Sequence, residues 1–275
     1  MTKLHLNRVN AGGLVLFGCG KMGSALLQGW LEAGVQPNAI TVLDPRPSDW
    51  LLGLQKDGLK INAKLDVPTV CVLAVKPQII AAAHSLSGPR FAETLFVSVA
   101  AGTTLSALGE ILGPEPAVIR TMPNTPAAIG QGITALVGNA RCRTEDLALA
   151  EVLMSTVGQV VRLESETQID AVTGVSGSGP AYVFHFIECL AAAGEAEGLT
   201  REVAIQLAKA TVAGAGALAQ ESNEAVSTLR ENVTSPAGTT AAGLSVLMSE
   251  DSGLLTLVRD AVRAATVRSI ELGAG

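Results

Sequence analysis

Three glycines near the start of the chain have the spacing of a phosphate-binding loop. The stretch LVLFGCGKMG places Gly18, Gly20 and Gly23 in the pattern G-x-G-x-x-G, after a short apolar run and before a stretch of helical periodicity. In that context the first glycine makes a tight turn, the second lets a pyrophosphate approach the backbone, and the third lets helix and strand pack closely. Because a helix N-terminus also offers free amides to an anion, the motif predicts a dinucleotide-binding loop.

Asp44 and Arg46 bear on which dinucleotide that loop would hold. Asp44 ends the second strand-like run, at the spacing of an acid that binds the adenine ribose 2′-hydroxyl and thereby favours NADH. Arg46 could instead hold the 2′-phosphate of NADPH. The two residues indicate opposite preferences, so the sequence predicts a nicotinamide cofactor and leaves NADPH and NADH both open.

Three later segments each follow a predicted strand: AVKPQ at 74–78, SVAAG at 98–102 and RTMPNTPAAIGQG at 120–132. Open α/β sheets bind ligands outside the carboxyl ends of their strands, so 74–78 and 98–102 should face the nicotinamide half of the cofactor, whereas 120–132 is a rigid, turn-rich segment at another strand end. Lys76 is either a catalytic lysine or a loop residue that holds backbone geometry, and we favour the second interpretation. Asn124 is either an amide that lines the site or part of a structural loop.

The stretch TSPAGTT, at 234–240, interrupts helical periodicity without offering an acid, a base or a metal ligand. Pro236 ends one predicted helix, and Gly238 begins the next. A helix N-terminus with free N–H groups binds an anion without any lysine, so this turn suits a small carboxylate. Thr240 adds a hydroxyl that both donates and accepts hydrogen bonds. The alternative is that the threonines only cap the helix.

The elements that must hold these motifs change in kind near residue 165. Before it, strand-like runs alternate with helical stretches, which predicts a Rossmann-type, doubly wound and mostly parallel α/β sheet over residues 1–165. After it only helical periodicity appears, and dense alanine and glycine predict that the helical domain, 166–275, is a tightly packed bundle or an obligate dimer. The predicted strands span 14–18, 40–44, 69–75, 94–99, 117–122, 133–137 and 159–163. The predicted C-terminal helices span 166–175, 181–197, 201–220, 224–233, 240–248 and 253–272.

Composition argues against several other classes of protein. The chain has 275 residues, 48% of them apolar, and a net charge of −6. No apolar window is long enough to span a membrane, and no basic cluster is present, so we expect neither a membrane nor a nucleic-acid partner. The histidines are isolated, so we expect no metal site. Cys19, Cys71, Cys142 and Cys189 are scattered, and no signal peptide is evident, which predicts reduced, buried thiols in a cytoplasmic protein.

Taken together, these motifs resemble those of the pyrroline-5-carboxylate reductase family. The segments SGSGPAYVF and SPAGTT are the most specific to it, whereas the glycine pattern fits many dehydrogenases. The resemblance implies reduction of Δ1-pyrroline-5-carboxylate to L-proline with NADPH or NADH, the last step of proline biosynthesis. It also implies a homo-oligomer that dimerises through the C-terminal helices, with assembly as far as a decamer. The segments that carry it are 18–23, 74–78, 120–126, 170–184 and 234–244.

The resemblance further implies which residues form the site. The substrate carboxylate would sit on the backbone of 237–240, and the Thr240 hydroxyl, the catalytic candidate, would face the ring nitrogen. The implied substrate-binding residues are Ser235, Ala237, Gly238, Thr239, Thr240 and Glu166. The implied cofactor-binding residues are Phe17, Gly18, Cys19, Gly20, Lys21, Met22, Asp44, Arg46, Asn62, Ala74, Val75, Lys76, Pro77, Val99, Ala100, Ala101 and Asn232. The implied site-lining residues are Met122, Pro123 and Asn124.

The sequence departs from the family pattern at two positions. Ala237 replaces the first glycine of the usual Ser-Pro-Gly-Gly turn, which is compatible with carboxylate binding provided that its φ is negative. Met248 stands where an acidic residue is often found. Two other functions remain as alternatives: a related hydroxyacid or imine-acid dehydrogenase, with Lys209 or Arg230 as its base, or a sensor that binds NAD(P)H without oxidising it.

Overall fold

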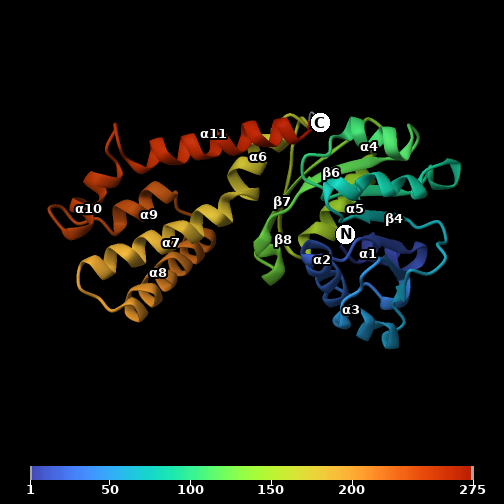
Figure 1. Ribbon diagram of the computed structural model, residues 1–275, viewed down its shortest axis with the longest axis horizontal. Coiled ribbons are helices and arrows are strands. Elements are labelled where there is room, and N and C mark those ends of the chain that lie inside the picture. The colour runs from blue at the N-terminus through green and yellow to red at the C-terminus, as the bar shows by residue number, and fades with distance from the viewer. Residues whose placement is uncertain (1, 274–275) are drawn as a thin grey trace. The chain divides into compact units, whose positions relative to one another are not determined.

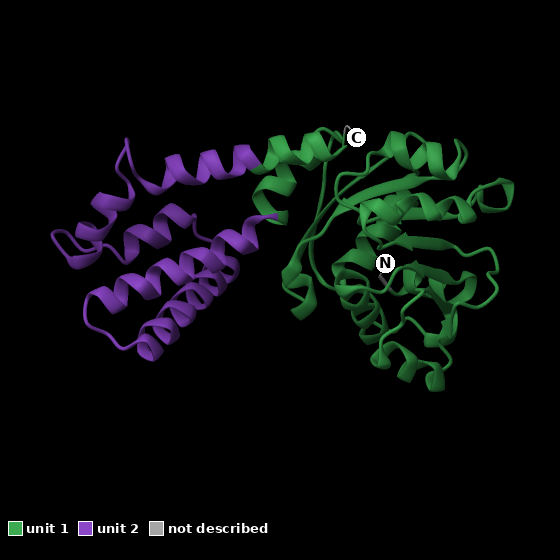
Figure 2. Cartoon of the chain, in the orientation of Figure 1, with its two compact units in different colours: residues 1–177, 265–275 green, residues 178–264 purple. Residues whose placement is uncertain are grey.

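The computed structural model describes residues 2–273 and separates the chain into two compact units (Figures 1 and 2). Unit 1 comprises Met1–Gly177 and Ala265–Gly275, and unit 2 comprises Ser178–Ala264. Unit 1 holds an eight-stranded sheet with helices, and the described part of unit 2 contains helices and turns. The predicted fold class is confirmed. The domain boundary predicted at residue 165 marks where strand-like runs give way to helical periodicity in the sequence, whereas the two units are defined by packing. That boundary therefore stays a prediction.

The sheet runs in the order β3-β2-β1-β4-β5-β6-β7-β8. Neighbouring strands pair in parallel, except that β6 and β7 are antiparallel. The strand order reverses at β1, which lies between β2 and β4, and an open α/β sheet binds its ligand at such a switch point. The strands are β1 (Leu14–Phe17), β2 (Ile40–Leu43), β3 (Lys60–Ile61), β4 (Val70–Leu73), β5 (Leu95–Ser98), β6 (Val118–Met122), β7 (Gly132–Gly138) and β8 (Gly158–Arg162).

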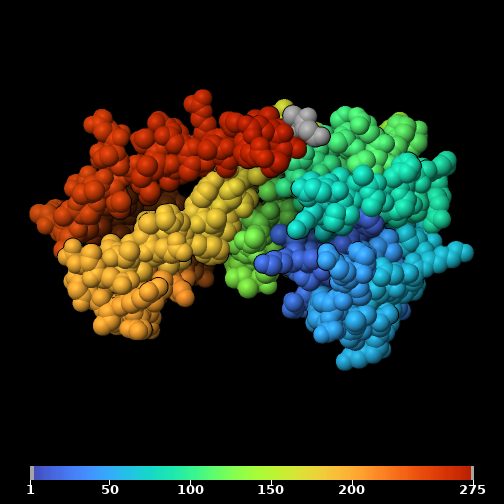
Figure 3. All heavy atoms as spheres, viewed as in Figure 1, coloured from blue at the N-terminus to red at the C-terminus, as the bar shows by residue number. Residues whose placement is uncertain are grey.

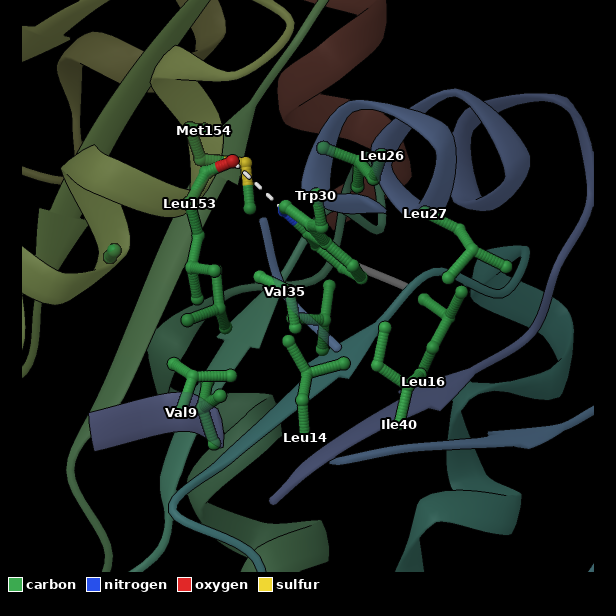
Figure 4. Packing of buried hydrophobic residues seen from close by; sticks show 14 of the residues in the cluster. Val9, Leu14, Leu16, Leu26, Leu27, Trp30, Val35, Ile40, Leu153 and Met154 are labelled. Atoms are coloured by element: carbon green, nitrogen blue, oxygen red, sulfur yellow. Dashed lines mark hydrogen bonds between the residues drawn. The ribbon is translucent and has the colours of Figure 1, made fainter. Parts of the chain in front are cut away.

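Apolar side chains cover both faces of the sheet. Leu14 and Leu16 belong to one buried cluster and Val15 to the other, because successive side chains of a strand point to opposite faces. In the first cluster the fully buried Trp30 donates its indole N–H to the Leu153 carbonyl at 2.9 Å (Figure 4). The helices of unit 1 are α1 (Thr2–Gly12), α2 (Lys21–Glu32), α3 (Asp49–Gly53), α4 (Leu105–Leu112), α5 (Thr144–Ser155) and α6 (Gln168–Val172). The shorter helical segments are η1 (Pro37–Ala39), η2 (Leu54–Asp57), η3 (Pro77–Leu86), η4 (Pro89–Phe91), η5 (Thr125–Ile129) and η6 (Thr173–Gly177).

Two elements of unit 1 lie outside the sequence predictions. Helix α1 has only two apolar residues that reach the core, Leu6 and Val9, which is too weak a pattern to indicate a helix. Strand β3 has two residues, so it has no alternation to detect. Both elements form because the sheet and its first cluster offer them a surface, which is a tertiary effect.

Unit 2 consists of α7 (Gly179–Ala196), α8 (Arg201–Glu221), α9 (Val226–Asn232), α10 (Thr239–Leu247) and the first half of α11 (Leu254–Gly273). The predicted helices match these elements to within two residues at each end. Helices α7 and α8 pack through small side chains: Ala191, Ala204 and Ala208 are buried there. The end of α11 belongs to unit 1, where the Ser269 hydroxyl donates to the Asp170 carboxylate at 2.7 Å.

Candidate functional site

The glycine loop after β1 has the geometry that a dinucleotide pyrophosphate requires. Gly18 has a φ of +92°, and a side chain there would lie 2.9 Å from the Ala74 carbonyl oxygen. A Cβ on Gly20 would meet no atom within 4 Å, so that face of the loop is open, whereas a Cβ on Gly23 would overlap the Gly18 carbonyl. Helix α2 begins directly afterwards, and no side chain caps its N-terminus, so its first amides are free to bind an anion.

The backbone aligns the ends of four parallel strands along one edge of the sheet. One backbone hydrogen bond joins each neighbouring pair of strand ends. Gly18 N, after β1, donates to Leu43 O of β2 at 2.8 Å. Ala74 N, after β4, donates to Phe17 O of β1 at 2.8 Å, and Val99 N, after β5, donates to Leu73 O of β4 at 3.0 Å. This edge therefore holds the glycine loop, Asp44, and the segments 74–77 and 99–101. The structure brings together at this edge all the predicted cofactor residues of unit 1, and they fit a dinucleotide.

Asp44 is held in place by backbone groups on both sides. Its carboxylate accepts hydrogen bonds from Cys19 N at 2.7 Å and from Arg46 N at 2.8 Å. Asn62, with a φ of +50°, donates to the Asp44 carbonyl at 2.7 Å and accepts from Asp44 N at 3.0 Å. The Asn62 side chain thus fixes the end of β2, a positioning role that its separation from Asp44 in the sequence does not reveal.

The cysteine inside the glycine loop is not a nucleophile. Burial, together with the nearby Asp44 carboxylate, raises the pKa of the Cys19 thiol to about 12. At neutral pH the thiol is therefore protonated and unreactive. Burial also raises the pKa of Cys71 and Cys142. Cys71 is buried, Cys19 and Cys142 are half-buried, and Cys189 in unit 2 is exposed, so the prediction of buried thiols holds for Cys71 and is wrong for Cys189.

The remaining strand-end residues have mainly backbone or structural partners. The Lys76 carbonyl accepts from Ile79 N at 2.9 Å at the start of η3, while its side chain is exposed. The Asn124 side chain accepts a hydrogen bond from Ile133 N at 2.9 Å, which joins the segment after β6 to β7. Met122 is half-buried and Pro123 is buried. Roles of these residues toward a ligand stay predictions.

Glu166 pairs with a buried arginine of unit 1. Its carboxylate accepts from Leu105 N, at the start of α4, at 2.7 Å and pairs with the Arg120 guanidinium at 2.8 Å. Arg120 is 3% exposed, and the half-buried Glu166 is its countercharge. Sequence analysis gave Arg120 no role, because the only signal was a charge inside an apolar run. Substrate binding by Glu166 stays a prediction.

The turn before α10 holds Ala237 in the left-handed region. Its φ is +56°, so the condition of a negative φ, stated above for carboxylate binding by this residue, is not met. Gly238 N donates to the Ser235 carbonyl at 3.0 Å, and Pro236 occupies the second position of the turn that this bond closes. A type II turn of this kind requires a positive φ at its third position, which is Ala237. Gly238 is tightly placed, since a side chain there would overlap the Ser235 hydroxyl.

The N-terminus of α10 is not capped by a threonine. Its N-cap is Gly238 and makes no side-chain cap, which contradicts the alternative that the threonines only cap this helix. Thr234 instead donates its hydroxyl to the Arg230 carbonyl, at the end of α9, at 2.6 Å. Within the described residues the exposed Thr240 hydroxyl has no hydrogen-bond partner. The turn therefore offers free amides and a free hydroxyl.

The implied residues fall in both units. The turn at 235–240 and Asn232 lie in unit 2, where Asn232 donates to the Glu224 carboxylate at 3.3 Å. Residues 2–273 contain no group of three or more His, Cys, Asp and Glu side chains that could hold a metal ion. Over the same residues, no helix has the length and apolar character needed to cross a membrane.

Known proteins resemble this chain over nearly its whole length. Residues 166–272 match the family described as pyrroline-5-carboxylate reductase dimerisation, and residues 14–102 match the NADP oxidoreductase, coenzyme F420-dependent family. A pyrroline-5-carboxylate reductase from Synechocystis sp. is 39% identical, over 94% of this chain and 98% of that protein. The chain belongs to the pyrroline-5-carboxylate reductase family.

Solved structures of the family share this fold. A pyrroline-5-carboxylate reductase from Coxiella burnetii aligns with a TM-score of 0.87 at 34% identity, covering 95% of this chain and 98% of that one. The Plasmodium falciparum pyrroline carboxylate reductase with NADP bound aligns with a TM-score of 0.78 at 29% identity, covering 95% and 98%. The family that the sequence motifs resemble is thereby confirmed.

Proposed function

We infer that this chain is an NAD(P)H-dependent oxidoreductase that reduces Δ1-pyrroline-5-carboxylate to L-proline, the last step of proline biosynthesis. Its family membership supports this activity, since the relatives cover nearly the whole chain. The structural observation that carries it is the N-terminus of α10, where free amides and the unpartnered Thr240 hydroxyl lie together. The turn at 235–240 has no acidic or basic side chain, and residues 2–273 contain no group of side chains that could hold a metal ion.

The substrate explains why such a sparse turn suffices. A protonated cyclic imine is already an electrophile, so the enzyme needs alignment, an anchor for the carboxylate and one hydrogen-bonding group near nitrogen. The free amides at the start of α10 bind the carboxylate. The Thr240 hydroxyl hydrogen-bonds the ring nitrogen of the imine and of the product amine.

Unit 1 holds the cofactor in this account. The glycine loop and the start of α2 bind the pyrophosphate, and the segments after β4 and β5 position the nicotinamide half. When bound, NADH or NADPH supplies the hydride that the C=N carbon accepts. The half-buried, neutral Cys19 thiol leaves the loop without a competing nucleophile.

The alternative hydroxyacid dehydrogenase is not supported by the contacts of its two basic candidates. Arg230 is paired with the Glu231 carboxylate, at 3.6 Å. Lys209 is an exposed residue of α8. The sensor alternative would leave the turn at 234–240 without a ligand.

The chain is homo-oligomeric, and we propose that it dimerises through the C-terminal helices, with dimers assembling as far as a decamer. The match to a dimerisation family supports the dimer. So does the surface of unit 2, where large apolar side chains such as Phe184 and Leu207 are exposed. We propose a cytoplasmic location on the basis of four free cysteines.

The direct test of the activity is loss of NADH or NADPH absorbance in the presence of Δ1-pyrroline-5-carboxylate, with each cofactor run separately and L-proline identified by mass spectrometry. We expect turnover with at least one of the two cofactors. No turnover with either would contradict the proposed function, and so would cofactor oxidation without L-proline.

A further inference from the structure

We propose that Asp44 makes the cofactor site discriminate against a 2′-phosphate, so that this chain prefers NADH to NADPH. The inference rests on the cofactor site of the proposed function and resolves the conflict between Asp44 and Arg46. The sequence places both residues at the end of the second strand, but it does not show which of them is fixed in place.

The carboxylate of Asp44 is fixed by two short hydrogen bonds. Cys19 N, inside the glycine loop, donates to one oxygen at 2.7 Å, and Arg46 N donates to the other at 2.8 Å. The backbone of Asp44 is held in turn by the two Asn62 hydrogen bonds. The negative charge therefore stays beside the loop and cannot swing away to make room for a phosphate.

This fixed carboxylate lies where the fold recognises the adenine ribose, at the end of the second strand. Each carboxylate oxygen has a further lone pair, so Asp44 can still accept a hydrogen bond from a ribose hydroxyl. A 2′-phosphate has no such proton to offer at neutral pH. It brings about −1.5 to −2 charges instead, which the carboxylate repels.

Arg46 does not offset this repulsion. Its backbone is held between Pro45 and Pro47, but its side chain is exposed, and within the described residues its guanidinium has no hydrogen bond or ion pair. An exposed, unanchored cation attracts a phosphate only weakly, because water and salt screen the interaction. The fixed charge of Asp44 therefore decides the preference.

The test uses ligands that carry only the adenosine half of the cofactor, so that it is independent of turnover. Titration calorimetry compares ADP with 2′,5′-ADP on the wild-type protein and on the Asp44→Asn, Asp44→Ser and Arg46→Ala variants. We expect the wild type to bind ADP about tenfold more tightly than 2′,5′-ADP. Both Asp44 variants should bind 2′,5′-ADP about tenfold more tightly than the wild type does. A merely damaged loop would not produce this gain of binding.

Arg46→Ala is the matched control, and it should change the ratio of the two affinities by less than about threefold. Wild-type protein that binds 2′,5′-ADP as tightly as ADP would overturn the inference, and so would Asp44 variants with an unchanged ratio of the two affinities.

If both Asp44 variants bind neither ligand, the ratio of the two affinities in the wild type decides alone. The predicted ratio without turnover of Δ1-pyrroline-5-carboxylate would remove the proposed function and leave this inference standing. Turnover of Δ1-pyrroline-5-carboxylate by a protein that binds 2′,5′-ADP more tightly than ADP would support the proposed function and overturn this inference.

Discussion

The two units bury their apolar residues to very different extents. Unit 1 encloses large side chains such as Trp30 and Phe96, which are fully buried on the two faces of its sheet. In the described part of unit 2 the buried apolar residues are three alanines, Ala191, Ala204 and Ala208. Unit 1 therefore has a core of its own, whereas unit 2 has helices without one.

The apolar residues that unit 2 lacks inside are on its surface. Phe184 is 60% exposed and Leu255 is 78% exposed, and Figure 3 shows side chains of the red C-terminal segment standing out from the surface. A soluble domain does not leave so many large apolar residues in water unless another surface covers them. The sheet unit is therefore complete in one chain, whereas the exposed apolar surface of the helical unit supports the proposal that a second copy covers it.

The largest effect is expected from placing a charge on the exposed apolar surface of unit 2. Leu207 of α8 is 52% exposed and lines an apolar groove of about 360 Å³ with α7. If a second copy covers this groove, Leu207→Asp buries an unpaired charge and weakens dimerisation by about 4 kcal/mol. Light scattering coupled to size-exclusion chromatography should show a shift from dimer toward monomer, with NADH binding in unit 1 retained.

The matched control for that variant is Leu4→Asp. Leu4 is 72% exposed on α1 of unit 1, where the core is already complete. This variant should keep the wild-type oligomer. A Leu207→Asp protein with the wild-type mass would contradict the view that unit 2 is completed by a second copy through this groove.

A somewhat smaller effect is expected inside unit 1, from Glu166→Ala. The change leaves the buried Arg120 without its countercharge, so the free energy of unfolding should fall by about 3 kcal/mol. Because the ion pair lies within one chain, urea denaturation should give the same loss at low and at high protein concentration. Glu166→Gln keeps one acceptor oxygen and should lose less. If the loss grew on dilution, the pair would instead support the assembly.

The smallest effect is expected at the turn of unit 2. Most positions of positive φ in the chain are glycines, whereas Ala237 holds a φ of +56°. An alanine in this conformation costs about 1 kcal/mol of strain in the folded state relative to glycine. Glycine offsets part of this gain, because its greater conformational freedom stabilises the unfolded chain. Ala237→Gly should therefore raise the free energy of unfolding by about 0.5 kcal/mol, as measured by thermal melting. A loss of stability would show that the methyl group makes a contact worth more than the strain.

Local patterns in the sequence were sufficient to predict most of the fold. The β-branched runs gave seven of the strands to within two residues, and the glycine spacing located the loop after β1. Strand β3 and helix α1 escaped prediction because tertiary contacts, rather than their own periodicity, make them form. The φ of Ala237 could not be predicted from the sequence, because the turn type, set by Pro236 and the bond from Gly238 to Ser235, decides it.

The partners of the candidate site residues could not be predicted from spacing. Asp44 is hydrogen-bonded to Cys19, and Glu166 to Arg120, across long separations in the sequence. Such pairs depend on which strand ends the sheet brings together. The position of Asp44 at a strand end and the family resemblance at Glu166 therefore indicated that these residues were of interest without showing what holds them.

The central claim is that a single neutral hydroxyl in unit 2 serves the chemistry, and Thr240 tests it most directly. The measurement is kcat/KM for Δ1-pyrroline-5-carboxylate with Thr240→Ala, and with Thr240→Ser, which keeps the hydroxyl. We predict that the alanine variant loses about a hundredfold in kcat/KM and that the serine variant stays within about threefold of wild type. A Thr240→Ala protein with wild-type kcat/KM would contradict the account.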